Sequence, residues 1–229
     1  VFKNIFELKP AHFAIYNQSG FSTKRYWKFI SREYTDNFNT TCEKVRFLLQ
    51  DAISKQLVSD VPLCTFLSGG LDSSIITAYA SQYYKKHNLG PLPTYSVDYI
   101  DNDKNFVKSD FQPNSDSHYI ELMKNRFHTK HHTIVLDTPE LADSLMDAMI
   151  ARDLPGMADV DSSLLLFCKN VKPYATVALT GECADEIFGG YPWFFREDAL
   201  SSHTFPWSIA VKERQDLLHP DISKKINLK

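Results

Sequence analysis

The spacing of apolar residues follows a regular pattern after residue 39. Stretches with apolar residues three or four positions apart, as expected for helices that cover a sheet, alternate with short apolar runs expected for buried strands. This pattern predicts helices over 40–59, 73–87, 116–128, 138–151 and 161–171, and strands over 62–67, 93–98, 132–136 and 175–180. Such alternation favours an α/β fold, a doubly wound parallel sheet with flanking helices.

The first 38 residues do not share this pattern. Residues 11–16 and 24–28 alternate between apolar and polar positions, and turn-forming residues from Asn17 to Gly20 follow the first of them, which predicts a β-hairpin. Thr40 and Glu43 have the spacing of a capping box. The first long helix is therefore expected to begin near Thr40.

The run SGGLDSS, residues 68–74, lies between a predicted strand and a predicted helix. Two adjacent glycines let several backbone N–H groups approach one anion, and the flanking serines add hydroxyl donors. A Walker-type loop would end in Gly-Lys followed by Ser or Thr, whereas here Asp72 follows Leu71. A carboxylate beside phosphates implies a divalent cation such as Mg²⁺. The alternative is an ordinary turn with glycine for the bend and serine for the cap.

A second run combines acidic residues with glycines. It is LTGECADEIFGGY, residues 179–191, and begins at the end of the last predicted strand. In parallel sheets the carboxyl ends of the strands lie at one edge, where ligands bind. The two runs are therefore expected to converge. The acidic residues of the second run could instead be solvated side chains in the first turn of a helix, where Asp and Glu are favoured.

These two runs together resemble the motifs of a known family. The first resembles the pyrophosphate (PP) loop of the ATP-pyrophosphatases, α/β enzymes of the adenine nucleotide α-hydrolase-like, Rossmann-like fold. The second resembles the signature of asparagine synthetases, and the two lie about 110 residues apart. The resemblance covers roughly residues 1–200 and is to the synthetase domain of the glutamine-hydrolysing type, present here as a fragment.

The resemblance implies an ATP site whose residues come from three strand ends. Adenine would contact the backbone of Phe66 or Leu67 and the strand end around Val97, and the ribose would face Thr180 and Gly181. The pyrophosphate group would be held by Ser68, Gly69, Gly70 and Ser73, with Mg²⁺ bound by Asp72 and Asp185.

The implied reaction converts L-aspartate, ATP and ammonia to L-asparagine, AMP and pyrophosphate through β-aspartyl-AMP. Glu182 is the carboxylate that would accept the proton of the attacking ammonia. One alternative is another amide-forming enzyme such as a β-lactam synthetase, a branch that commonly carries a different residue in place of Glu182. Another is a catalytically silent nucleotide-binding module, which the retained acidic residues Asp72 and Asp185 disfavour.

The expected domain organisation follows from the same resemblance. Residues 1–38 would be a lead-in hairpin from a preceding domain, residues 39–200 the synthetase domain, and residues 201–229 a truncated C-terminal extension. A glutaminase domain belongs to the full-length proteins of this type, and the chain starts at Val1 without one, so glutamine hydrolysis is not expected of it. A homodimer is possible.

Composition agrees with a soluble globular enzyme. The chain has 229 residues, 43% of them hydrophobic, and a net charge of −3 with both signs interspersed, so nucleic-acid binding is not expected. No signal peptide or long apolar run suggests secretion or a membrane, so we expect a cytoplasmic location and no membrane binding. The four cysteines form no CxxC pair, which argues against a sulfur-transfer enzyme. Cys42, Cys64 and Cys168 fall within apolar patterns and are expected in the core, while Cys183 could be exposed.

Three further segments are less informative. The polar stretch from Tyr99 to Ser117 is either a substrate lid or a solvated insertion. His131 and His132 are adjacent in a predicted strand, so their rings should point to opposite faces and not form a metal cluster. The segment from Arg152 to Asp161 is expected to form a loop with three acids at the carboxyl edge of the sheet, and no roles are assigned there.

Overall fold

The computed structural model describes residues 2–108, 114–205, 209 and 211–225. The chain divides into two compact units, residues 1–46 and 47–229, and each is described by itself. Among the described helices, none is both long enough and apolar enough to cross a membrane.

The first unit contains a two-stranded antiparallel hairpin, β1 (His12–Asn17) and β2 (Gly20–Arg25). The hairpin was predicted, but the expected second strand at 24–28 is wrong, because Asn17 pairs directly with Gly20 and leaves only a two-residue turn. Helix α1 (Phe38–Gln56) also begins earlier than expected. The Asn37 side chain accepts a hydrogen bond from the Thr40 N–H at 2.9 Å, so Asn37 takes the capping role predicted for Thr40.

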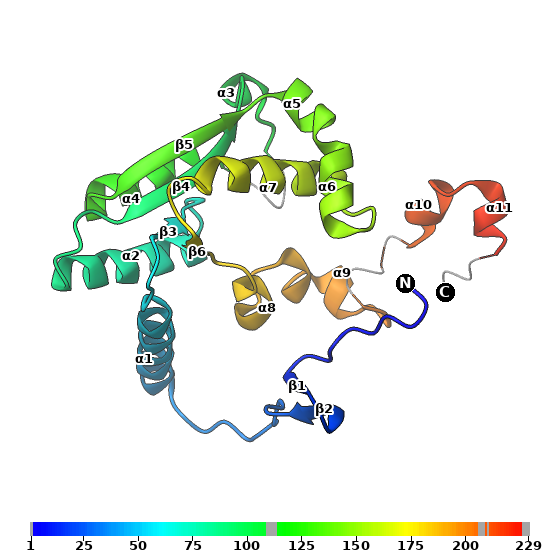
Figure 1. Cartoon of the computed structure of the whole chain (residues 1–229), viewed down its shortest axis with the longest axis horizontal. Helices are drawn as coiled ribbons and strands as arrows, with labels where there is room; N and C mark the ends of the chain where they lie inside the picture. Colours follow the sequence, from blue (N-terminus) through cyan, green and yellow to red (C-terminus); the bar gives the residue numbers. More distant parts are fainter. Residues whose placement is uncertain (1, 109–113, 206–208, 210, 226–229) are drawn as a thin grey trace. The chain divides into compact units, whose positions relative to one another are not determined.

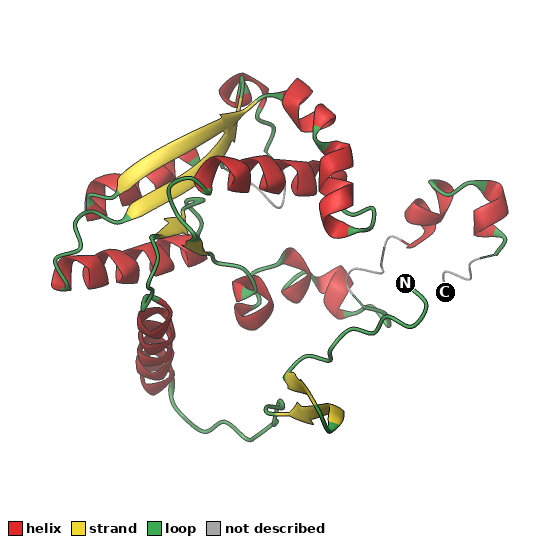
Figure 2. Cartoon of the chain, in the orientation of Figure 1, coloured by secondary structure: helices red, strands yellow, loops and turns green. Residues whose placement is uncertain are grey.

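The second unit is built on a four-stranded sheet, drawn in yellow in Figure 2. Its strands are β3 (Leu63–Phe66), β4 (Pro93–Tyr99), β5 (Lys130–Leu136) and β6 (Val177–Leu179). They lie in the order β5-β4-β3-β6, and all three neighbouring pairs are parallel. The predicted parallel α/β sheet is thus confirmed, and the runs at 68–74 and 179–191 both follow strands that are direct neighbours.

Helices cover both faces of this sheet (Figure 1). Helices α2 (Leu71–Lys86) and α4 (Ser117–Phe127) pack together on one face, and α7 (Ala158–Val171) packs on the other. Alternate residues of β3 enter two separate cores. The first core consists of Ile53, Leu57, Leu63, Ala80 and Leu92, and the second of Cys64, Tyr95, Phe167, Val171 and Ala175. Two buried faces explain why β3 carries apolar residues on both sides, with Thr65 buried through its hydrogen bond to the Thr77 hydroxyl at 2.9 Å.

The structure divides the helix predicted over 138–151 into α5 (Thr138–Asp143) and α6 (Leu145–Arg152). Ser144 separates them, and its hydroxyl donates to the Leu141 carbonyl at 3.0 Å, which competes with continuous helical bonding. Helix α7 begins three residues before the expected start at 161, so Asp161 belongs to its first turn and not to a loop.

A short helix, α3 (Asn102–Asn105), interrupts the polar stretch between residues 99 and 117. Residues 109–113 of the predicted lid or insertion lie outside the described residues. After β6 come α8 (Ala184–Phe188), the 3₁₀ turn η1 (Pro192–Phe194) and helices α9 (Glu197–Leu200), α10 (Val211–Asp216) and α11 (Pro220–Ser223). Within the predicted C-terminal extension, residues 206–208, 210 and 226–229 are likewise not described.

The histidine pair on β5 behaves as predicted, with its rings on opposite faces. The His131 ring lies within hydrogen-bond distance of the Thr94 and Ser96 hydroxyls, at 2.9 and 3.1 Å. The His132 ring stacks on Tyr95 at 5.3 Å on the other face. Burial lowers the pKa of His131, so it is a neutral hydrogen-bonding group within the sheet.

The cysteines follow the prediction only in part. Cys64 is fully buried, and burial raises the pKa of its thiol to about 12. Cys183 is exposed, as considered above, and Cys42 is half-buried. The expected core position of Cys168 is wrong, because its side chain lines an open cleft beside β3 and not the closed core.

Candidate functional site

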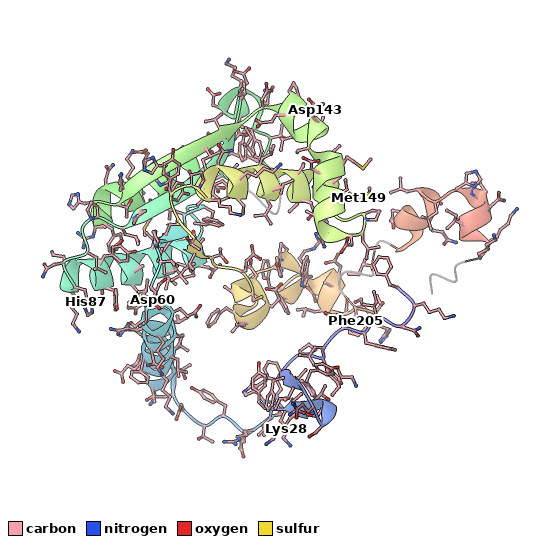
Figure 3. All side chains as sticks on the ribbon, in the orientation of Figure 1. Lys28, Asp60, His87, Asp143, Met149 and Phe205 are labelled. Carbon is pink, nitrogen blue, oxygen red and sulfur yellow. The ribbon has the colours of Figure 1, made fainter. Side chains whose placement is uncertain are left out.

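The loop between β3 and α2 presents backbone N–H groups at the start of a long helix. Gly70 is the N-cap residue of α2, with φ −66° and ψ 165°, and no side chain caps the helix there. Helix α2 runs from this loop to His87, its C-cap residue, which is labelled in Figure 3. The uncapped N–H groups of a 16-residue helix suit an anionic ligand.

Two serine hydroxyls hold the loop in its bent form. The Ser73 hydroxyl accepts a hydrogen bond from the Ser68 N–H at 3.2 Å and donates to the Gly70 carbonyl at 3.2 Å. The Ser68 hydroxyl lies 3.0 Å from the Ser73 hydroxyl. Ser73 is buried, so its hydroxyl shapes the loop from inside, and its contact with a phosphate stays a prediction.

At Gly69 the loop packs closely against the start of α4. Its φ of +83° lies in the left-handed region, and a Cβ there would approach the Asp116 carbonyl oxygen to 2.8 Å and the Tyr119 Cβ to 3.0 Å. Sequence reasoning did not anticipate this contact, because it depends on which helix packs behind the loop. The amino-terminal turn of α4 therefore fixes the position of residues 68–74, which are called the phosphate loop from here on because of the ligand expected there.

Gly69→Ala is expected to lower the free energy of unfolding by about 1–3 kcal/mol, because the added methyl group overlaps backbone and the residue must keep a positive φ. Gly70→Ala is the matched control. Its φ is negative and its Cβ would lie 3.4 Å from the Ser68 hydroxyl, so a change within about 1 kcal/mol is expected. Urea unfolding measures both variants, and equal losses would show that α4 does not constrain the loop.

The acidic loop after β6 packs directly on the start of α2. A Cβ at Gly181 would lie 3.0 Å from the Asp72 Cβ and 3.3 Å from the Ser73 nitrogen. Burial, and after it the charge of Asp185, raise the pKa of the Asp72 carboxyl. The two runs that are far apart in the sequence thus meet, and they bring two carboxylates near each other.

The Asp72 and Asp185 pair fits Mg²⁺ bound together with a nucleotide. Among the described residues, no group of three or more His, Cys, Asp or Glu side chains could hold a metal by itself. Mg²⁺ typically takes one or two carboxylates and completes its octahedron with water and substrate phosphates. Two carboxylates beside uncapped helix N–H groups match that requirement.

Glu182 lies on the exposed side of the acidic loop, between Gly181 and Cys183. Cys183 is the N-cap residue of α8 and has a φ of +70°, a left-handed conformation that is unfavourable for a residue with a side chain. The bend at Cys183 separates Glu182, which precedes it, from Asp185, which lies in the first turn of α8. Strain of this kind is found preferentially where a loop must present functional groups.

Cys183→Gly is expected to raise the free energy of unfolding by about 0.5–1 kcal/mol. Glycine removes the left-handed penalty of about 1–2 kcal/mol, and the greater freedom of glycine in the unfolded chain offsets part of that gain. Ala184→Gly at the first residue of α8 is the control and should lower stability by about 0.5–1 kcal/mol. Thermal unfolding compares the two, and a loss for both variants would contradict the account.

The residues expected around adenine and ribose lie at the same edge but are less closely grouped. Leu67 is buried and its N–H donates to the Tyr95 carbonyl at 2.8 Å, so a contact with adenine would have to use its carbonyl. The Phe66 ring packs edge-on against Phe167 at 4.7 Å, and only its backbone is placed for a ligand. Thr180 is half-buried where β6 ends.

A cleft of about 380 Å³ opens beside the end of β4. Val97, at its wall, is partly exposed. The other lining residues are mostly polar and come from β4, β5, α3, α4 and the residues next to the two helices: Ser96, Asp98, Tyr99, Asn102, Phe106, Ser115, Asp116, Ser117, Ile120, Glu121 and Thr133. Asp116 and Ile120 also adjoin Gly69, so the cleft is continuous with the support of the phosphate loop. The alternation of strands and helices predicted the edge, but not which helix residues form the cleft.

Two known proteins are similar in sequence to most or all of this chain. The asparagine synthetase (glutamine-hydrolyzing) 3 of Bacillus subtilis is 52% identical over 229 residues, which are 100% of this chain and 37% of that protein. A putative asparagine synthetase (glutamine-hydrolyzing) 2 of Methanocaldococcus jannaschii is 28% identical over 199 residues, 83% of this chain and 35% of that protein. The chain therefore spans about a third of the length of these relatives.

Among solved structures, the NH3-dependent NAD synthetase from Campylobacter jejuni overlaps 83% of this chain and 92% of its own, with a TM-score of 0.33 and 10% identity, too low to carry an argument. The sequence model described as asparagine synthase matches residues 44–229. That match includes both the phosphate loop and the acidic loop. The chain belongs to the asparagine synthase family.

Proposed function

We propose that this chain carries the ATP site of a protein that forms an amide from L-aspartate and ammonia, with AMP and pyrophosphate as the other products. The observation that carries the proposal is the packing of Gly181 against Asp72 and Ser73, which joins the phosphate loop to the acidic loop. An ordinary turn, with glycine for the bend and serine for the cap, would not require a second carboxylate nearby. The activity is proposed for the whole protein, since the chain matches only part of its relatives.

ATP would lie across the carboxyl ends of β3, β4 and β6. The pyrophosphate part would lie against the loop of Ser68, Gly69 and Gly70 and meet the uncapped N–H groups at the start of α2, where the helix end favours negative charge. Adenine would contact the Leu67 carbonyl or Phe66 backbone and Val97, and the ribose would face Thr180 and Gly181. Ser73 would hold the loop in shape for these contacts.

Asp72 and Asp185 would hold Mg²⁺, which neutralises the charge that develops on the leaving pyrophosphate. Without a cation, burial and then the charge of Asp185 disfavour the ionised form of Asp72 and raise its pKa. The phosphates alone would disfavour that form further. The pair therefore favours nucleotide that arrives with a divalent cation over free nucleotide.

The side-chain carboxylate of L-aspartate would attack the α-phosphorus of ATP to form β-aspartyl-AMP and release pyrophosphate. Ammonia would then attack the acyl carbon, AMP would leave, and Glu182 would accept the proton that the new amide nitrogen loses. The exposed position of Glu182 at the bend before Cys183 supports this role, because its carboxylate is open to a bound ligand.

The source of ammonia is part of the same proposal. The two relatives above are named as glutamine-hydrolysing enzymes, so we propose that a glutaminase domain supplies ammonia in the full-length protein. We also propose a cytoplasmic location, and a homodimer stays a prediction.

Exchange of labelled pyrophosphate into ATP tests the adenylation step. In the presence of Mg²⁺, exchange should require L-aspartate and should occur without ammonia, because the acyl-adenylate forms first. Exchange that needs no aspartate, or that prefers another carboxylic acid, would reject the proposed substrate. Absence of any ATP binding would reject the nucleotide site itself.

A further inference from the structure

The segment from Gly189 to Tyr191 closes α8 and carries no role in the proposed reaction. Three acidic side chains lie close to it in the sequence: Glu182, Asp185 and Glu186. The segment contacts two of them differently, because Gly190 adjoins Asp185 and the Tyr191 hydroxyl binds Glu186.

Asp185 is placed by Gly190. A Cβ at Gly190 would overlap the Asp185 Oδ1, so the carboxylate occupies the space that the side chain of any larger residue would fill. The Gly190 N–H also donates to the Asp185 carbonyl at 3.0 Å. The acidic loop packs on Asp72 at Gly181, and in this position the charge of Asp185 adds to burial in raising the pKa of Asp72.

Glu186 is held by Tyr191. The Tyr191 hydroxyl donates to the Glu186 Oε1 at 3.3 Å. Burial, and then the charge of Glu186, raise the pKa of Tyr191, so the hydroxyl keeps its proton and remains a donor. The aromatic ring cannot swing freely, because it stacks on Trp193 with ring centroids 4.3 Å apart and planes 26° apart.

We propose that Tyr191 is a positioning residue of the nucleotide site, which holds Glu186 aside while Gly190 leaves Asp185 free to face Asp72. The inference rests on the proposed function. It explains why one carboxylate of α8 joins Asp72 and its neighbour does not. A released Glu186 would add a third negative charge to those of Asp72 and Asp185 near the triphosphate, which that charge would repel.

Binding of Mg²⁺·ATP by calorimetry tests the proposal with four proteins. Tyr191→Phe keeps the ring stack and loses the hydroxyl, so it should fold normally and bind Mg²⁺·ATP about 5- to 10-fold more weakly. Glu186→Gln removes the charge and should bind within about 2-fold of the parent. The double variant should also bind within about 2-fold of the parent, because no carboxylate is left to be released.

A double variant as weak as Tyr191→Phe would overturn the proposal, since Tyr191 would then act on the nucleotide without Glu186. Parent-like binding by Tyr191→Phe would overturn it as well. Gly190→Ala gives an independent arm: it should weaken Mg²⁺·ATP binding as much as Asp185→Asn and change ATP binding in EDTA by less than about 2-fold. A parent protein that binds no Mg²⁺·ATP would instead reject the proposed function, so the two failures are distinguishable.

Discussion

Glu182→Gln is expected to lower amide synthesis by about 10²–10⁴-fold while Mg²⁺·ATP binding stays within about 2-fold of the parent. Loss of a general base typically costs this much, and glutamine keeps the size of the side chain but cannot accept the proton. Glu182 lies outside the Asp72 and Asp185 pair, so nucleotide affinity should not depend on it. Rates of asparagine formation and calorimetric binding are measured on the same preparation.

Glu186→Gln is the matched control for that experiment, because it is the same change four residues away in the same loop. Glu186 is bound by the Tyr191 hydroxyl, and a glutamine oxygen can accept the same hydrogen bond. It should retain synthesis within a few-fold of the parent. Near-parent synthesis by Glu182→Gln, or an equal loss in both variants, would exclude Glu182 as the specific proton acceptor.

Asp72→Asn should have opposite effects on stability and on nucleotide binding. A carboxylate whose pKa is raised in the folded protein destabilises the fold when it is ionised, so its removal should raise the thermal midpoint of the ligand-free protein at neutral pH. Mg²⁺·ATP binding should weaken by at least about 10–100-fold, the range seen when even the residues that support metal ligands are lost.

The shift in the thermal midpoint on adding Mg²⁺·ATP measures the loss of binding in Asp72→Asn. At 100 times its Kd, a ligand adds about 2.7 kcal/mol of stability, so Mg²⁺·ATP should stabilise the parent strongly and Asp72→Asn little. Asp143→Asn, at an exposed position labelled in Figure 3, is the control and should behave like the parent. A ligand-free midpoint that falls in Asp72→Asn would contradict the cost of burying the ionised Asp72 carboxylate beside Asp185.

The sequence predicted the sheet well, because strands buried on two faces and helices of period 3.6 leave strong patterns. Because those strands were expected to be parallel, the candidate site could be placed at their carboxyl ends. The boundaries were less predictable where a side chain competes with the backbone. Asn37 caps α1 in place of Thr40, and the Ser144 hydroxyl separates α5 from α6.

For the candidate site, the sequence identified its two loops but not the contacts that these loops make with other elements. Local patterns identified the phosphate loop and the acidic loop, since each combines glycine with polar residues after a strand. They could not show that Asp116 supports Gly69, that Gly190 makes room for Asp185, or that Tyr191 binds Glu186. Those contacts depend on helix packing and on side-chain direction, which no pattern within a single segment specifies.

The most direct measurement is pyrophosphate release from ATP and Mg²⁺, with and without L-aspartate and ammonium, with asparagine quantified in the same samples. The account predicts that pyrophosphate release requires aspartate and that, with ammonium, one asparagine forms for each pyrophosphate. Pyrophosphate with no asparagine would point to another acceptor, such as the substrate of a β-lactam synthetase. ATP binding without any turnover would contradict the proposed synthesis and favour a silent nucleotide-binding module.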